Sequence, residues 1–324
     1  MLWSKNSSFF NITFLLFEVN IKYYASALSS FVIWGLFSLV LRPLQEYAAL
    51  EILLYRVLFA TASIWLANFL FRRKETQRSF QQISNMNSSD KRKVVGNYVV
   101  SALMLSLNWF LFIFVMNTIS VNATSLAYLL CPILTTALAT IFLGERLRMG
   151  QWAAVFVSVL SCFMLSIGHF VDLFYSLMIA LTYAIYLVLQ KANTATDKLF
   201  SLSIHITLST IILLPLFGIV GLGANKSAIF YELVWVIAVV FTIVPLFLNA
   251  YALKGLSSSL VGILLYVNPL LSFTLAITYF SEPITLIQIT AYGMIIVSVI
   301  WFNLLYFKKQ KAVDSVPEQP IIPH

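Results

Sequence analysis

The chain has 324 residues, of which 60% are hydrophobic and only 10% are charged, and its mean hydropathy is +0.92. A soluble domain is about one quarter charged, so this composition excludes a soluble globular protein and predicts an integral membrane protein. The net charge of +8 is then better explained by membrane orientation than by nucleic-acid binding. Cys131 and Cys162 lie inside apolar runs, where we expect them to pack as small apolar side chains.

Ten apolar stretches follow one another along the chain, each close to the ~20 residues that a helix needs to cross a bilayer. We predict membrane helices at roughly residues 24–41, 52–71, 95–116, 121–143, 150–168, 173–190, 200–221, 232–252, 259–280 and 285–307. Residues 1–23 form an N-terminal extension whose apolar part is too short to cross, and residues 308–324 form a cytoplasmic tail. The connections are short except for residues 72–94, which are polar and strongly basic.

The basic residues predict the orientation, because cytoplasmic loops of membrane proteins are enriched in Lys and Arg. With the N-terminus inside, all of the 20 basic residues except Arg42, Arg56 and Lys226 fall on the cytoplasmic side. An even number of spans returns the chain to the side on which it began. We therefore expect both termini to be cytoplasmic and the protein to lie in a bacterial inner membrane.

Two long stretches, residues 121–166 and 258–303, are copies of one pattern. A slide of 137 positions superposes, without a gap, Pro132 on Pro269, Leu138 on Leu275, Glu145 on Glu282, Ala154 on Ala291 and Ser161 on Ser298. A period of this length indicates a duplicated half rather than a short solenoid repeat.

The duplication divides the ten predicted helices into two halves of five, residues 24–168 and 173–307. Five is an odd number, so the second half enters the membrane from the opposite side. We therefore predict an all-α membrane fold of ten helices in two inverted five-helix repeats. Inverted repeats are typical of alternating-access carriers, whose substrate site lies where the halves meet.

Six short motifs, in their order and spacing, resemble the RarD group of the EamA-type drug/metabolite transporters. They are EILLYR (51–56), NW (108–109), SLAYLLCP (125–132), GERL (144–147), VPLFLNAYAL (244–253) and GILLYVNP (262–269). The resemblance extends over about residues 24–306. It implies the EamA fold, with a central pathway lined by the first four helices of each half and a peripheral fifth helix.

Pro132 and Pro269 lie in the middle of matched spans. A proline has no N–H and frees the carbonyl four residues earlier, here those of Tyr128 and Leu265. A freed carbonyl at this depth must meet protein, water or substrate. Each proline is either a kink that lets helices pack or a hinge beside the pathway, and we assign both as candidate hinges.

Arg56 is the only charged residue predicted well inside a span, where an isolated charge is costly. Glu51 and Glu46 lie toward the same end, but Glu51 is five residues away, about 140° around a helix, so a bond within one helix is poor. Two roles remain open for Arg56. It either forms an ion pair or outer gate with another helix, or it contacts an anionic group of a substrate.

The other candidate site residues are uncharged polar or aromatic side chains within spans: Trp34, Asn108, Tyr128, Tyr183, Asn249 and Tyr266. Asparagine in a membrane helix most often bonds a neighbouring helix, and Tyr and Trp often face the membrane interface. The alternative is a wall of amide, hydroxyl and indole groups that bind a ligand. We assign all six, with Arg56, as candidate substrate-binding residues, because Tyr128 and Tyr266 flank the two prolines and Asn108 begins a motif.

The remaining ionisable residues argue against chemistry in the membrane. Glu145 and Glu282 precede the fifth and tenth spans, and each is expected to cap the helix that follows it. None of the 12 carboxylates falls near the middle of a span, so coupling through a midplane acid is disfavoured. His169 and His205 lie near span ends, where an interfacial or hydrogen-bonded role is expected rather than a proton relay.

The sequence therefore predicts a secondary transporter, not an enzyme, that moves a small amphipathic metabolite or drug between two inverted halves. We expect no catalytic residue, metal or cofactor. The expected partners are the substrate and the lipid bilayer, without nucleic acid, and the protein is expected to be a monomer or weak dimer. The alternatives are a structural or sensory helical bundle and, less favoured, an intramembrane lipid-modifying enzyme, which would need a convergent set of His, Asp, Glu or Cys.

Overall fold

The computed structural model describes residues 21–118, 121–167, 170–220, 226–279, 281 and 285–314. Within these ranges the chain is almost entirely helical and contains no strand. Most of the predicted N-terminal extension and much of the tail lie outside the described residues, as do His169 and Glu282.

The first part of the chain contains a helix over residues 21–35, α2 (Phe37–Leu41), a 3₁₀ turn (Arg42–Leu44), α3 (Ala49–Phe71), α4 (Arg73–Ser84), α5 (Ser88–Thr118), α6 (Val121–Phe142) and α7 (Met149–Ser166). The second part contains α8 (Phe170–Ala192), α9 (Lys198–Leu213), α10 (Leu216–Val220), α11 (Ala228–Ala238), a π-helical turn (Val239–Ile243), α12 (Val244–Gly255), α13 (Ser258–Leu264), α14 (Val267–Thr278) and α15 (Leu286–Asp314).

A helix lies at each of the ten predicted spans. In the described ranges nine helices are long and apolar enough to cross a membrane, and Lys198–Leu213 is a shorter apolar helix at the seventh position. Pro215 follows this helix and separates it from α10, because proline cannot donate to the preceding turn. The basic connection after α3 is largely helical, since it forms α4 and the first turns of α5.

The outer surface of the bundle is apolar, as a membrane protein requires. On α7, Phe156 and Phe163 are 61% and 58% exposed, and on α15, Val297 and Ile300 are 57% and 55% exposed. Large apolar side chains in these positions would destabilise a soluble protein, whereas in a bilayer they contact lipid. The chain is therefore a multi-pass membrane protein.

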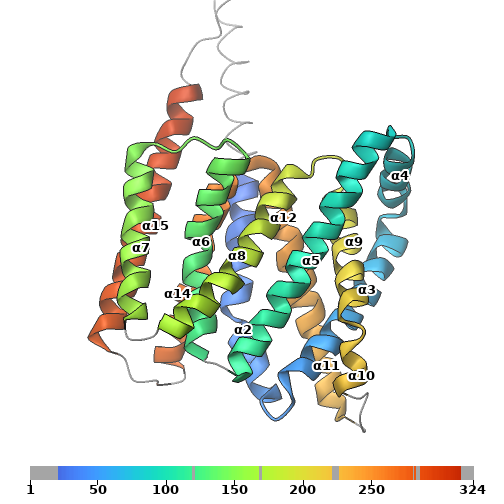
Figure 1. The fold of residues 1–324 in the computed structure, drawn as a ribbon, viewed down its shortest axis with the longest axis horizontal. Coiled ribbons are helices and arrows are strands. Elements are labelled where there is room, and N and C mark those ends of the chain that lie inside the picture. The colour runs from blue at the N-terminus through green and yellow to red at the C-terminus, as the bar shows by residue number, and fades with distance from the viewer. Residues whose placement is uncertain are drawn as a thin grey trace, which may run out of the picture.

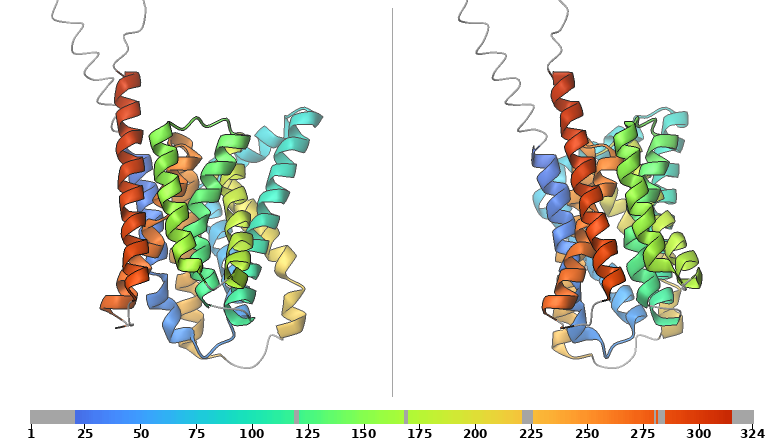
Figure 2. Two further views of the ribbon diagram at one scale, coloured as in Figure 1. Left: turned by 60° about the vertical axis from the view of Figure 1, so that its left-hand side comes forward. Right: turned by 90° about the vertical axis from the view of Figure 1, so that its left-hand side faces the viewer.

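The two sides of the bundle carry different elements. The C-terminal end of α15 and the basic helix α4 lie on one side, while α10 and α11 lie on the other (Figure 1). In both further views, α15 rises beyond the other helices on its side (Figure 2). We call the side with α4 and the C-terminal end of α15 the α4 side, and the opposite side the α11 side.

A row of hydrogen bonds fixes the helix over residues 21–35 against the second part of the chain. Ser26 donates to the carbonyl of Leu248 at 2.8 Å and Ser30 to the carbonyl of Pro245 at 2.8 Å. The residue number of the acceptor decreases as that of the donor increases, so the helix over residues 21–35 and α12 are antiparallel. Small hydroxyl side chains allow such close approach of helices in a membrane.

A second seam joins α7 and α15, which run side by side at one edge of the bundle (Figure 1). The Ser161 hydroxyl donates to the carbonyl of Ala291 at 2.8 Å, and the Ser298 hydroxyl donates to the carbonyl of Ala154 at 2.7 Å. The slide of 137 positions exchanges these two bonds, because it carries Ser161 to Ser298 and Ala154 to Ala291. The seam is therefore reciprocal, as in a two-fold interface.

Candidate substrate cavity

A cavity of about 760 Å³ lies between the two parts of the chain. This volume is in the range of small-molecule binding sites, which hold ~300–1,000 Å³. Its wall comes from the helix over residues 21–35 and from α2, α3, α5, α6, α7, α8, α12, α14, α15 and the π-helical turn. Both sequence halves thus contribute to one cavity.

The cavity reaches the helix ends on the α11 side only. There its lining residues include Leu41 at the end of α2, Ala49 at the start of α3, Asp172 in the first turn of α8 and Thr285 before α15. No described residue at the helix ends of the α4 side lines it. Among the described residues, the lining of the cavity therefore extends to one end of the bundle and not to the other.

Five of the seven predicted binding residues line the cavity: Trp34, Arg56, Asn108, Tyr128 and Tyr183. The other two lie behind the wall. Asn249 is 2% exposed and donates to the hydroxyl of Tyr183 at 3.1 Å, so it positions a lining residue. Tyr266 is fully buried and does not line the cavity.

The two candidate hinges have different local structures. The helix of the second copy is broken between α13 and α14, just before Pro269, which lines the cavity. The helix of the first copy continues through Pro132 as the unbroken α6. In the second copy, the carbonyl of Leu265 accepts from the backbone N–H of Asn268 at 3.0 Å in a tighter turn, which separates the two helices.

Arg56 is held by the second part of the chain. Its Nε donates to the Thr242 hydroxyl at 2.7 Å, and its guanidinium carbon lies 5.1 Å from the ring centre of Trp109 and 5.9 Å from that of Phe37. Among the described residues no carboxylate forms an ion pair with Arg56.

Glu51, the acid closest to Arg56 in α3, has another partner. It pairs with Lys226 at 2.8 Å, and both side chains are mostly buried. These hydrogen bonds raise the pKa of Lys226. The pair ties the start of α3 to the segment before α11, so an ion pair on the α11 side exists, but it is formed by Lys226 and not by Arg56.

Trp34 is fixed by a carbonyl that a proline frees. Its indole Nε1 donates to the carbonyl of Phe241 at 2.9 Å. Pro245 lies four residues after Phe241 and has no N–H to return to it, which leaves this carbonyl available at the π-helical turn. Neither Pro245 nor Thr242 was among the predicted site residues, although the missing N–H of Pro245 indicated a free carbonyl at Phe241.

Asn108 and Tyr183 have part of their hydrogen-bonding capacity occupied. The Asn108 amide donates to the carbonyl of Ile179 at 2.9 Å and to the Thr182 hydroxyl at 3.2 Å, which ties α5 to α8. The ring of Tyr183 meets that of Trp34 edge-on, with 6.0 Å between centres. Asn108 thus makes the expected interhelical bonds while it also lines the cavity.

The wall also includes residues of both fifth helices. Met164 and Leu165 of α7 contribute to it, as do Gln288 and Tyr292 of α15. The family resemblance implied that these helices are peripheral. Each in fact presents one apolar face outward and another part of its surface to the cavity.

Glu145 joins the two halves on the α4 side of the molecule. Its carboxylate accepts from the backbone N–H of Ser258 at 2.6 Å, and from the N–H and hydroxyl of Ser259 at 3.0 and 2.6 Å. It therefore caps α13, in the other half, and the expectation that it caps the following helix was wrong. At the start of that helix, α7, the Gln151 side chain instead accepts from the N–H of Arg148 at 3.0 Å.

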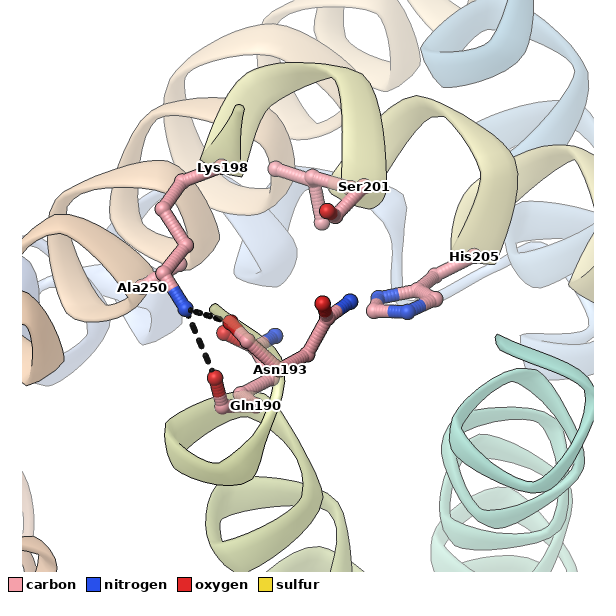
Figure 3. A pocket seen from close by; sticks show the side chains of 7 residues that line it. Gln190, Asn193, Lys198, Ser201, His205 and Ala250 are labelled. Carbon is pink, nitrogen blue, oxygen red and sulfur yellow. Dashed lines mark hydrogen bonds between the residues drawn. The ribbon is translucent and has the colours of Figure 1, made fainter. Parts of the chain in front are cut away.

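A second cavity of about 10 Å³ lies between α8, α9 and α12 on the α4 side (Figure 3). The Lys198 ammonium turns toward the backbone and donates to the carbonyls of Gln190 and Asn193. Neither nitrogen of His205, which is 1% exposed, has a hydrogen-bond partner among the described residues. The volume suits a single water molecule and not an organic ligand.

Comparison with known proteins gives the family. The EamA-like transporter family matches residues 21–167 and again residues 172–304. The chain is a member of the EamA-like transporter family. Protein RarD of Streptomyces exfoliatus is 31% identical to it over 257 residues, which cover 77% of this chain and 78% of that protein. Protein RarD of Escherichia coli K12 is 27% identical and covers 87% and 92% of the two chains.

Two further comparisons agree with this membership. An uncharacterized transporter, YojE, of Bacillus subtilis strain 168 is 25% identical, with 88% of this chain and 95% of that protein covered. A solved crystal structure of a protein superposes with a TM-score of 0.67 at 12% identity, over 88% of this chain and 97% of that chain. The latter supports the fold alone. This EamA member is thus similar to bacterial proteins named as transporters, which supports a place in the inner membrane.

Proposed function

We propose that this EamA member carries a small amphipathic molecule across the cytoplasmic membrane by alternating access between two inverted halves, residues 24–168 and 173–307. The observation that carries the proposal is the cavity of about 760 Å³, which both halves line and whose described lining residues reach the helix ends of the α11 side and not those of the α4 side. A structural or sensory bundle has no need of such a space at the centre of the molecule. A carrier that is occluded toward one side requires it.

The reciprocal seam between α7 and α15 supports the inverted arrangement. Ser158 and Ser161 of α7 form hydrogen bonds with Ser298 and Ala291 of α15, so the two helices are antiparallel. A two-fold axis along the membrane normal leaves helix direction unchanged, whereas an axis in the membrane plane reverses it. Helices that are exchanged by the repeat and are antiparallel therefore fit an axis in the plane.

The orientation follows from charge. The α4 side carries the basic helix α4 and the C-terminal end of α15, and basic residues favour the cytoplasm. Both termini are then cytoplasmic, and the cavity faces outward. Trp34, Arg56, Asn108, Tyr128 and Tyr183 are the proposed binding wall, with Asn249 and Tyr266 behind it and Pro132 and Pro269 as proposed hinges.

The test is a cavity-filling variant with a matched control on the same helix. Ser272 of α14 lines the cavity, whereas Thr274 is exposed on the outside of α14. Metabolite extracts are offered to proteoliposomes, and compounds accumulated by the wild type are identified by mass spectrometry. We expect Ser272→Trp to abolish this accumulation and Thr274→Trp to preserve it. Equal accumulation by both variants, or none by the wild type above empty vesicles, would contradict a carrier that works through this cavity.

A further inference from the structure

Arg56 is the one basic residue in the cavity wall, and its charge has no protein partner of opposite sign among the described residues. An unpaired charge within a membrane bundle is costly and is kept where it binds an ion or substrate. Contacts with the faces of Trp109 and Phe37 attract the guanidinium but do not neutralise it.

The guanidinium is oriented before any ligand binds. The Thr242 hydroxyl donates its proton to the carbonyl of Ile237 at 2.8 Å, so its oxygen is left to accept from Nε of Arg56. Both Thr242 contacts arise at the π-helical turn, an irregularity often found at functional sites. With Nε engaged, the two terminal NH₂ groups of Arg56 form no hydrogen bond with a described residue.

We propose that these NH₂ groups bind the anionic group of the transported molecule, and that the substrate class is a monoanion with a carboxylate on an apolar or aromatic body. This inference rests on the proposed transport function and names its substrate chemistry. A planar guanidinium matches a carboxylate through two parallel hydrogen bonds.

The rest of the cavity wall fits one negative charge and an apolar body. A dianionic phosphate would require a second cation, and among the described residues the wall offers none beyond Arg56. Asp172, the acid in the wall, lies in the first turn of α8, near the end of the cavity. Aromatic rings that suit an apolar body surround the space, and the rings of Phe273 and Tyr292 stack with 3.9 Å between their centres.

The experiment uses the purified full-length protein and three probes of nearly equal shape: 3-phenylpropanoate, 3-phenylpropan-1-ol and 3-phenylpropan-1-amine. Binding is measured by the ligand-dependent shift in thermal unfolding and by equilibrium titration. We expect the wild type to bind the anion at least about tenfold more tightly than the alcohol, and the amine most weakly. The reason is that a hydrogen bond between two charged groups is stronger than one to a neutral hydroxyl.

Two variants separate the charge of Arg56 from its orientation. In Arg56→Gln the preference for the anion over the alcohol should fall to about one. In Thr242→Val, which keeps the charge but removes the acceptor for Nε, the preference should fall severalfold without disappearing. The same unfolding curves report whether each variant is folded. If Arg56→Gln does not fold, Arg56→Lys takes its place, because it keeps the positive charge but lacks the planar guanidinium.

Three outcomes would overturn the anion proposal. They are equal binding of the alcohol and the anion by the wild type, an unchanged preference in Arg56→Gln, and absence of anion binding. The proposed transport function is judged separately. Accumulation of a neutral compound that Ser272→Trp abolishes and Arg56→Gln leaves intact would remove the anion proposal while leaving the carrier proposal in place.

Discussion

The contact of Glu145 with the start of α13 is the part of the structure whose removal has the clearest expected consequence. One carboxylate accepts three hydrogen bonds from Ser258 and Ser259, across the two halves and at the positive end of a helix. Glu145→Gln keeps the shape of the side chain but removes the charge. It also places an NH₂ group against backbone N–H and hydroxyl donors.

The size of the effect follows from these bonds. Hydrogen bonds to a charged group contribute ~1.5–3 kcal/mol each in favourable cases, but these three share one partly exposed carboxylate and are not additive. We expect Glu145→Gln to weaken the closed arrangement of the α4 side by ~2 kcal/mol, which is about 30-fold in the ratio of open to closed molecules.

The assay is the alkylation rate of a cysteine placed at Ser258. This residue is fully buried, and its hydroxyl has no hydrogen-bond partner among the described residues, so Ser258→Cys leaves the cap through the backbone N–H in place. The native Cys131 and Cys162 are 2% and 1% exposed and give the background rate. When opening and closing are fast, alkylation follows the open population.

In detergent, adding Glu145→Gln to Ser258→Cys should raise the alkylation rate by up to about 30-fold. The matched control is Glu46→Gln, which neutralises an exposed carboxylate between the 3₁₀ turn and α3, near the α11 side. It should leave the rate unchanged. If Glu145→Gln alters the rate by less than twofold, or if Glu46→Gln alters it equally, then Glu145 does not hold the α4 side closed.

Two stability predictions concern the other seams, and both are measured by thermal unfolding in detergent. Trp34→Phe should lower the free energy of unfolding by ~1 kcal/mol less in a Pro245→Ala background than in the wild type. The reason is that the backbone N–H of the new alanine competes with the Trp34 indole for the carbonyl of Phe241. If the effects of the two substitutions are additive, this explanation is wrong. Ser161→Ala should lower the free energy of unfolding by ~1 kcal/mol, and Ser298→Ala should lower it by more, because the Ser298 hydroxyl also lies 2.6 Å from the Ser158 hydroxyl. A smaller effect of Ser298→Ala would contradict the reciprocal seam.

The positions of the membrane helices could be predicted because the bilayer imposes one length and one polarity on every span. The residues of the cavity wall were harder to predict from the sequence. Arg56 was identified because a charge is conspicuous in an apolar span, and Tyr128 because it lies beside a proline. Tyr266 was assigned by the same reasoning as Tyr128, yet it lies at the break between α13 and α14 and is fully buried, which the repeat alone does not reveal.

The expectation for Glu145 was wrong for a different reason. Capping rules read the helix that follows in sequence, but the donors that Glu145 meets lie 113 and 114 positions away. A contact between the halves has no local pattern. By contrast, the role of Pro245 was readable, because the rule that frees a carbonyl four residues before a proline applies to Phe241 as it does to Tyr128 and Leu265.

The contacts between the two halves indicate which parts of the molecule can move. Ser26, Ser30 and Trp34 bind the second half through backbone carbonyls, and Arg56 binds it through Thr242. Separating the halves along this line would leave several polar groups unpaired at bilayer depth, at ~1–3 kcal/mol each. The contacts that join the halves on the α4 side include those of the Glu145 carboxylate and the Arg72–Asp197 ion pair at 3.2 Å, whose side chains are partly exposed. Water can satisfy such groups when they separate, so a rocking motion is easier there. The Arg56–Thr242 contact would then stay near the axis of motion, where one guanidinium can meet an anion from either side of the membrane.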